Sequence, residues 1–292
     1  MIAKRFARIP VRYLTVMALL LIGCSIVLQC RRDIAQRPSE NPILVLYAFA
    51  AEGKLIGEQM TVSRTDRHIG RTVLVGQISG KDIVLAESGV GTTNAAMTTQ
   101  RMIDIYQPRT VVFTGIAGAI DTSVRVGDIV VADTWIEHDY GYVGADGFEP
   151  GRLSLYSPAA DSLVRMTELP VDSALLAAAN GLEIGQLGLD SIGARLPRLM
   201  VGGVGVTGNT FIDSREKRSW LVEKFSAMVT DMESAAVAQV CIANDMPFVV
   251  FRSASDLAGG SGSETAQTEL DEFYQAAAGN ASKVVMAYLA RL

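Results

Sequence analysis

The sequence has few of the residues that bind transition metals. Its 292 residues include two histidines, His68 and His138, and three cysteines. Neither histidine is spaced for metal binding with a cysteine or a carboxylate, as a zinc site requires. The sequence therefore predicts no metal site.

Cysteines are too few and too unevenly placed to form a disulfide framework. Cys24 and Cys30 lie in the N-terminal segment, so Cys241 stands alone in the rest of the chain. It falls in an alanine-rich stretch that predicts a helix, where an isolated cysteine most often packs as a small apolar side chain. We expect Cys241 to be an inert core residue.

Basic clusters are also missing after residue 40. The net charge is −5, and no stripe of lysine and arginine appears in that part of the sequence. Proteins that bind the phosphate backbone of nucleic acids need such a stripe. The sequence therefore excludes nucleic acid as an expected partner.

The first 32 residues have the layout of an export signal. Four basic residues precede an apolar run at 13–28, and two arginines follow it. As a helix this run would span about 24 Å, which is short for a membrane core of about 30 Å. The basic residues before the run favour a cytoplasmic N-terminus, so the rest of the chain is expected outside the cytoplasm.

Three forms of this segment remain open. Residues 21–24 (LIGC) resemble a bacterial lipobox, with Cys24 as the lipidation candidate, yet the apolar run continues past Cys24. The alternatives are a lipoprotein, an uncleaved signal anchor and a cleaved signal peptide. We expect an exported protein, attached to the membrane through residues 1–32 and facing the periplasm or the cell exterior. Residues 33–41 are polar and are interpreted as a linker.

From residue 42 to 292 apolar runs typical of strands alternate with helical patterns. Strands are predicted at 43–49 and 110–114, the latter leading into a small-residue turn at 115–118, and helices from about 50, at 93–106 and at 269–289. Residues 79–81 predict a hairpin between two further strands. For residues 144–198 only a helix among loops is expected. The alternation predicts one α/β domain.

Three acidic residues are candidates for a site. Asp256 lies just past an apolar run typical of a core strand, Glu233 begins an alanine-rich helix after another strand, and Glu52 follows the first strand. A buried charge is costly without partners, so such acids often belong to sites. Structural roles remain alternatives: a helix N-terminal acid for Glu233, a turn cap for Asp256, and a surface position for Glu52. Phe211 would by default belong to the core.

Six short segments, in the same order and spacing, resemble the nucleoside phosphorylase/nucleosidase superfamily over residues 43–291. They are residues 88–91 (SGVG), 114–118 (TGIAG), 126–131 (VGDIVV), 207–212 (TGNTFI), 231–236 (DMESAA) and 252–256 (RSASD). Within this superfamily they most resemble the methylthioadenosine/S-adenosylhomocysteine nucleosidases. The resemblance implies a single domain with a central mixed β-sheet flanked by helices, a homodimer, and no metal or organic cofactor.

The resemblance also implies a substrate and a reaction. The substrate would be a purine nucleoside such as 5′-methylthioadenosine or S-adenosylhomocysteine, cleaved by water at its N-glycosidic bond, as in purine catabolism and methionine salvage. Glu52 would activate the water, Glu233 would bind the ribose hydroxyls, and Asp256 would protonate the base. Other substrate-binding positions would be Phe211, Ile212, Met232, Ser255, Ile116, Ala117 and Gly118, with Arg252 next to Glu233.

Two departures from the superfamily pattern bear on the reaction. Phosphorylases place arginines around a phosphate, but Phe113-Thr114 and residues 47–51 offer no cation at the corresponding positions. Ile116 stands where the nucleosidases usually carry a serine.

Leu270 and Phe273 suggest an apolar pocket for the 5′ substituent. A phosphorylase, another nucleosidase of this fold and a non-catalytic exported nucleoside-binding protein remain alternatives.

Overall fold

The structure is a computed structural model that describes residues 41–292, apart from residues 193–194. The predicted signal or anchor segment, Cys24 and nearly all of the predicted linker lie outside the described residues. Within them, no helix has both the length and the apolar character needed to cross a membrane.

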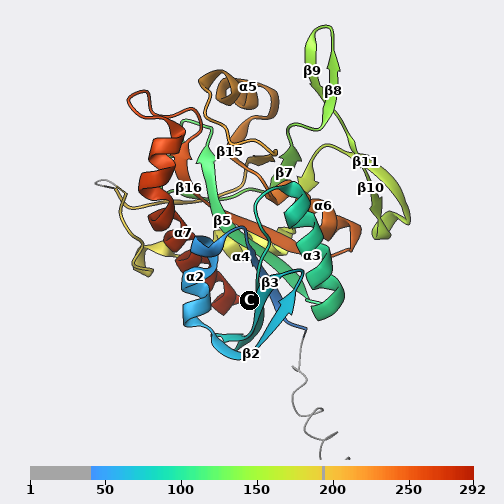
Figure 1. The fold of residues 1–292 in the computed structure, drawn as a ribbon, viewed down its shortest axis with the longest axis vertical. Coiled ribbons are helices and arrows are strands. Elements are labelled where there is room, and N and C mark those ends of the chain that lie inside the picture. Colours follow the sequence, from blue (N-terminus) through green and yellow to red (C-terminus); the bar gives the residue numbers. More distant parts are fainter. Residues whose placement is uncertain (1–40, 193–194) are drawn as a thin grey trace, which may run out of the picture. The chain divides into compact units, whose positions relative to one another are not determined.

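A large mixed sheet forms the centre of the domain (Figure 1). Its strands are β1 (Ile43–Tyr47), β2 (Thr61–His68), β3 (Arg71–Ile78), β4 (Lys81–Glu87), β5 (Thr110–Ala119), β6 (Ile129–Val131), β7 (Thr134–Glu137), β12 (Leu169–Pro170), β13 (Leu199–Val201), β14 (Val204–Thr207), β15 (Ala227–Asp231) and β16 (Phe248–Leu257). β5 is the central strand. It pairs in parallel with β1 and β16 and antiparallel with β15.

Helices flank this sheet. They are α2 (Ala50–Gln59), α3 (Thr92–Tyr106), α4 (Ser173–Asn180), α5 (Arg215–Phe225), α6 (Ser234–Ala243) and α7 (Ala266–Arg291), with short 3₁₀ turns at Pro158–Ala160 and Ile184–Gln186. α7 packs on β16 and β5 and against α2, whereas α3 packs against α6. In Figure 1 these two helix pairs lie on opposite sides of β5. The predicted fold class, an α/β domain with a central mixed sheet, is confirmed.

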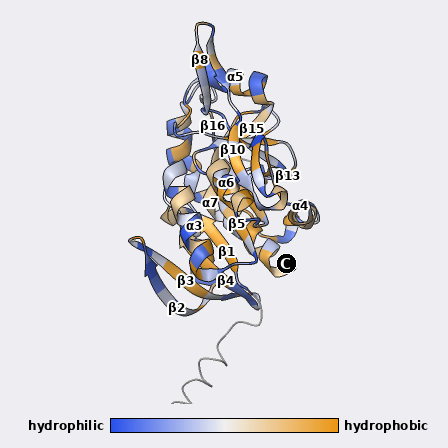
Figure 2. Ribbon diagram, turned by 90° about the vertical axis from the view of Figure 1, so that its right-hand side faces the viewer, coloured by the Kyte–Doolittle hydropathy of each residue, from blue (hydrophilic) through white to orange (hydrophobic). Residues whose placement is uncertain are grey.

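The core follows from the apolar strands. Residues 43–46 of β1 and 248–251 of β16 are at most 2% exposed, as expected for strands covered on both faces. Figure 2 shows the same contrast in colour, with hydrophobic β1 and β5 inside and hydrophilic β2 at the edge of the sheet. An edge strand rich in polar and charged residues resists pairing with other chains.

Most of the predicted elements are present, with three differences. The predicted turn at 115–118 is the second half of β5, and β16 continues through Asp256 instead of ending before it. Residues 141–166 form two hairpins, β8 (Gly141–Gly144) with β9 (Gly147–Pro150), and β10 (Leu153–Ser157) with β11 (Ser162–Met166). All but the first three of these residues fall in the region 144–198, where only a helix among loops was expected. Glycines and polar residues had suggested loops there, but tight hairpins use the same residues.

Candidate active site

A cavity of about 450 Å³ opens where several strands of the sheet end. Its walls come from the segments after β1, β4, β14 and β15, from the second halves of β5 and β16, and from the first turns of α7. Ligands of open α/β sheets bind at the carboxyl ends of strands. The lining residues are Ala48, Phe49, Glu52, Val90, Ile116, Ala117, Gly118, Thr210, Phe211, Ile212, Thr230, Asp231, Met232, Glu233, Ser255, Asp256, Leu270, Asp271 and Tyr274.

Glu52 is held by backbone N–H groups on two sides of the cavity. Its Oε2 accepts from the N–H of Ala48, just before α2, at 2.6 Å, and its Oε1 accepts from the N–H of Ile116 on β5 at 2.8 Å. The side chain is 1% exposed. Burial raises the pKa of Glu52, whereas Arg252 and these N–H groups lower it. A surface position for Glu52 is therefore wrong.

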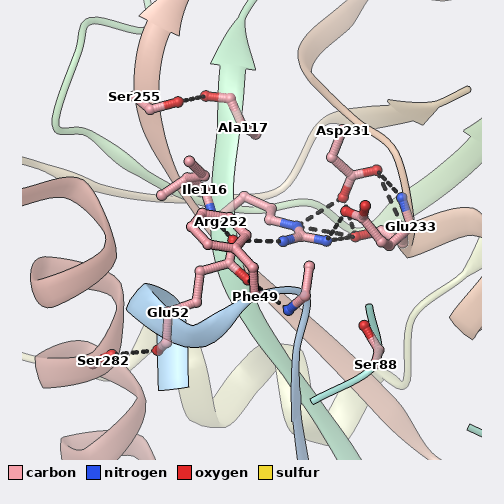
Figure 3. Close-up of polar contacts among 12 residues, drawn as sticks. Phe49, Glu52, Ser88, Ile116, Ala117, Asp231, Glu233, Arg252, Ser255 and Ser282 are labelled. Carbon is pink, nitrogen blue, oxygen red and sulfur yellow. Dashed lines mark hydrogen bonds and ion pairs between the residues drawn. The ribbon is translucent and has the colours of Figure 1, made fainter. Parts of the chain in front are cut away.

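Glu233 lies across the cavity from Glu52 and shares a guanidinium with it (Figure 3). Its Oε1 accepts from the N–H of Gly91 at 2.9 Å, and its Oε2 accepts from Nη2 of Arg252 at 3.3 Å. Burial raises the pKa of Glu233 to about 7, Arg252 opposes that rise and Asp231 adds to it. The helix N-terminal role is filled by Asp231, whose Oδ1 accepts from the N–H groups of Glu233 and Ser234 at 3.2 Å.

Arg252 lies beneath the cavity and connects the acids. It is fully buried on β16, and its Nε donates to Oδ2 of Asp231 at 2.7 Å. Its Nη1 stands 3.7 Å from Oε1 of Glu52, and the guanidinium covers the ring of Phe113 at 4.2 Å. One cation thus faces three buried carboxylates. Removing that cation would leave uncompensated buried charge.

Asp256, unlike Glu52 and Glu233, has no cation in direct contact among the described residues. Its Oδ2 accepts from the hydroxyl of Ser255 at 2.8 Å, while its buried Oδ1 has no hydrogen-bond partner there. Burial raises the pKa of Asp256 to about 7. No backbone N–H of the described chain donates to this carboxyl, so it does not cap a turn. Its free oxygen is available to a ligand in the cavity.

Two glycines of β5 make room for these groups. A Cβ at Gly115 would lie 2.0 Å from Nη1 of Arg252 and 2.4 Å from Oε1 of Glu52. A Cβ at Gly118 would lie 3.0 Å from Oδ1 of Asp256. Glycine within a strand often marks such a close approach.

Comparison with known proteins identifies the family. A family model described as the phosphorylase superfamily matches residues 42–290. The chain belongs to this superfamily. It is 36% identical over 250 residues to a 5′-methylthioadenosine/S-adenosylhomocysteine nucleosidase of Colwellia psychrerythraea, covering 85% of this chain and 95% of the relative. The corresponding nucleosidase of Tolumonas auensis is 33% identical, covering 85% and 98% of the two chains.

Solved structures of the superfamily agree with this placement. The Colwellia psychrerythraea nucleosidase in complex with adenine has a TM-score of 0.72 and 33% identity, covering 87% of this chain and 96% of that one. A futalosine hydrolase of Helicobacter pylori has a TM-score of 0.70 and 26% identity, covering 86% and 98%. The resemblance found in the sequence is confirmed.

The superfamily residues predicted from the sequence lie around this cavity, with two exceptions. The three acids line it together with Phe211, Ile212, Met232, Ser255, Ile116, Ala117 and Gly118. Phe211 is 39% exposed and so is not a core residue. Arg252, predicted to bind substrate, does not line the cavity but contacts the acids behind it. Phe273 does not line it either.

Several lining residues were not predicted. Phe49 and Tyr274 face each other with ring centroids 6.5 Å apart, on α2's N-cap and on α7. Tyr274 follows Leu270 by four positions and Phe273 follows it by three, so helical spacing alone does not decide between them. Asp231 stands two residues before Glu233 and received no role, because its pairing with Arg252 depends on the register of strands distant in sequence.

Proposed function

We propose that this protein hydrolyses the N-glycosidic bond of adenine nucleosides with a modified 5′ end and releases adenine. Methylthioadenosine and S-adenosylhomocysteine are the expected substrates. The observation that carries the proposal is the meeting of Glu52, Glu233 and Asp256 in one cavity, with different surroundings for each. The names of the relatives support the choice of substrate.

Asp256 is suited to activate the leaving group. A purine anion leaves slowly, and protonation at N7 makes the departing base neutral. Because the pKa of Asp256 is raised to about 7, much of it carries a proton at neutral pH. The proton would pass from the carboxyl to N7 while the electrons of the C1′–N9 bond move to the base. Phe211 and Ile212 would provide the apolar wall for that base.

The other two acids serve the sugar and the water. Positive charge develops on the ribose as the bond breaks. Glu233 in its ionised form, which the neighbouring Arg252 guanidinium favours, can stabilise that charge while accepting hydrogen bonds from the hydroxyls. Water then bonds to C1′, and its proton passes to Glu52. This division, with one carboxyl on the leaving group and another on the water, is that of other glycoside hydrolases.

Water fits the cavity better than phosphate as the nucleophile. In the described part of the chain no lysine or arginine lines the cavity. Arg252 contacts Glu52 and Glu233, but it is fully buried and already faces three carboxylates. A phosphate dianion would thus lack the charged donors that normally bind it.

Product analysis tests the proposal. Purified residues 41–292 would be incubated with methylthioadenosine and S-adenosylhomocysteine in phosphate-free buffer, and free adenine and ribose products measured. We expect adenine without phosphate, and a loss of about 10²-fold or more in Glu233→Gln. Release that requires phosphate and gives a sugar phosphate would make the protein a phosphorylase. Binding without turnover in the parent would make it a nucleoside-binding protein.

We also propose that the protein is a homodimer and that it is exported and held at the membrane. The superfamily resemblance supports the dimer, as do Tyr142 and Val143 of the β8–β9 hairpin, which are 68% and 72% exposed in one chain. Light scattering of residues 41–292 would give the mass of one chain if the dimer is wrong. Export and attachment rest on the charges and apolar run of residues 1–32.

A further inference from the structure

Glu269, in the first turn of α7, is a buried acid that the mechanism above does not use. It is 6% exposed and does not line the cavity. Both of its carboxylate oxygens are occupied by backbone donors: Oε2 accepts from the N–H of Leu257 at 2.7 Å, and Oε1 accepts from the N–H of Ser261 at 3.0 Å. These two donors stand at the two ends of the segment that directly follows Asp256.

Residues 257–261 form a tight turn, and Glu269 accepts a hydrogen bond from the backbone at each end of it. Between the two donors, the N–H of Gly260 bonds to the carbonyl of Leu257. Gly260 has a φ of 71°, and a Cβ there would lie 2.0 Å from the carbonyl oxygen of Glu264, so only glycine fits. Without the carboxylate, the N–H groups of Leu257 and Ser261 would lose their acceptor.

We propose that Glu269 is a positioning residue for Asp256. Its carboxylate fixes the turn that follows Asp256, and its negative charge favours the acid form of the Asp256 carboxyl. The inference rests on the proposed function, in which that acid form donates a proton to the leaving base. It assigns to α7 a part in the chemistry as well as in the wall of the cavity.

The charged and polar groups around Asp256 agree with this role. Burial is the largest influence on the pKa of Asp256 and raises it, and the negative charges of Glu269 and Asp213 raise it further. The hydroxyl of Ser255 and the charge of Arg218 lower it. Asp213 is held at the start of α7, where it accepts from the N–H of Ala266 at 2.9 Å. Arg218 on α5 donates through Nε to the carbonyl of Ile120 at 2.7 Å rather than to either acid. Within the described part of the chain, neither Glu269 nor Asp256 forms an ion pair, so the charge of Glu269 is free to act on Asp256.

The test compares two substitutions at Glu269 with one control. Glu269→Gln keeps the size and removes the charge, whereas Glu269→Asp keeps the charge and withdraws the carboxylate by one methylene. Glu272→Gln makes the same charge change at an exposed position of the same helix. For each variant kcat and KM would be measured from pH 5 to 9, together with the thermal unfolding temperature.

For Glu269→Gln we expect the fall in kcat/KM on the alkaline side to begin at lower pH, so that the ratio of rates at pH 8 and pH 6 drops by about threefold. Glu269→Asp should lower kcat by about tenfold and leave that limb near its parental pH, because the charge remains. Glu272→Gln should match the parent. An unmoved limb in a folded Glu269→Gln protein would overturn the proposal. If that variant does not fold, an unchanged kcat in Glu269→Asp overturns it.

A direct titration separates this inference from the proposed function. The carboxyl ¹³C resonance of Asp256, assigned by its loss in Asp256→Asn, would be followed against pH in the ligand-free parent and in Glu269→Gln. We expect its midpoint at lower pH in the variant. A parent that cleaves no nucleoside would reject the proposed function, yet the titration would still decide whether Glu269 acts on Asp256.

Discussion

At the scale of single residues, the raised pKa of Asp256 affects both catalysis and stability. Its pKa is raised to about 7 from an ordinary value of 3.8, so the fold favours the protonated form. The stability that this form contributes is complete below about pH 4 and is lost as the pH rises through 7. The ionised carboxyl therefore destabilises the native state in the range where the alkaline limb of activity falls.

Asp256→Asn should separate these two effects. We expect kcat to fall by about 10²–10⁴-fold, because the amide cannot donate the same proton. At pH 8 the variant should be more stable than the parent by on the order of a few kcal/mol, with little difference at pH 4. Urea unfolding at both pH values measures this. A stability difference that does not change with pH would mean that the pKa is not raised.

The acids of the site could be predicted from the sequence because each stands next to an apolar run. Burial of Glu233 and Asp256 follows from the strands before them, and the superfamily resemblance identifies Glu52. The Arg252 contacts with Glu52 and Asp231 could not be predicted, since they require three strands to be aligned in register. Phe273 was predicted to line the cavity, whereas Tyr274 does. Neighbouring residues point about 100° apart on a helix, and the sequence does not fix which of the two faces the cavity.

At the scale of secondary structure, β5 carries the geometry of the site, and its glycines explain an incorrect prediction. Gly115 and Gly118 suggested a turn, because glycine commonly interrupts a strand. Here the strand continues, and the missing side chains allow Arg252, Glu52 and Asp256 to approach its backbone. The same residues in a sequence can thus mark a turn or a close approach, and only the neighbouring strands decide between them.

Gly115→Ala should show this constraint. The new Cβ would lie 2.0 Å from Nη1 of Arg252, so either the guanidinium or the strand must move. We expect a loss of about 1–3 kcal/mol in the free energy of unfolding and at least about tenfold in kcat/KM. Gly185→Ala is the matched control, because no atom of the described residues lies within 4 Å of a Cβ there and its φ is not positive. Parental activity in Gly115→Ala would contradict the argument.

A second element prediction concerns the loop that carries Phe211. Asn209, two residues earlier, accepts from the N–H of Thr92 at 3.0 Å and donates to its hydroxyl at 2.7 Å. Thr92 begins α3 next to Gly91, which donates to Glu233. This pair of bonds therefore joins the proposed base-binding loop to the segment that holds the sugar-binding acid.

Asn209→Ala should loosen that connection. We expect KM for the nucleoside to rise by about three- to tenfold with kcat changed by less than about threefold, because the groups that react remain in place. Asn180→Ala, at the exposed end of α4, gives the same change away from the site. If kcat falls and KM does not change, the connection serves the chemical step rather than binding.

At the scale of the whole molecule, the alternation of strands and helices is sufficient to predict an α/β domain, but not its strand order. β5 pairs with β1, β15 and β16, which come from opposite ends of the described chain. Such pairings depend on contacts between distant segments, which a local pattern does not contain. The cavity forms where those strands end, so the site depends on this long-range order.

If residues 1–32 direct export, as proposed, they decide where such an enzyme would act. A nucleosidase outside the cytoplasm would meet nucleosides that leave the cell or arrive from its surroundings, whereas methionine salvage inside the cell would require the same domain without export. The two settings differ in substrate supply, although the catalytic residues would be the same. The form of the segment therefore matters for function as well as for location.

The form of residues 1–32 can be determined by expressing three proteins in a bacterium: the full chain, Cys24→Ser and residues 41–292. We expect the full chain in the membrane fraction with its catalytic domain digested by protease added to spheroplasts, because basic residues before the apolar run retain the N-terminus inside. Radiolabelled palmitate on the full chain but not on Cys24→Ser would identify a lipoprotein. An unlabelled, uncleaved chain in the membrane would identify a signal anchor, and a shortened chain free in the periplasm a cleaved signal. A full chain that stays in the cytoplasm, protected from the protease, would show that residues 1–32 do not direct export.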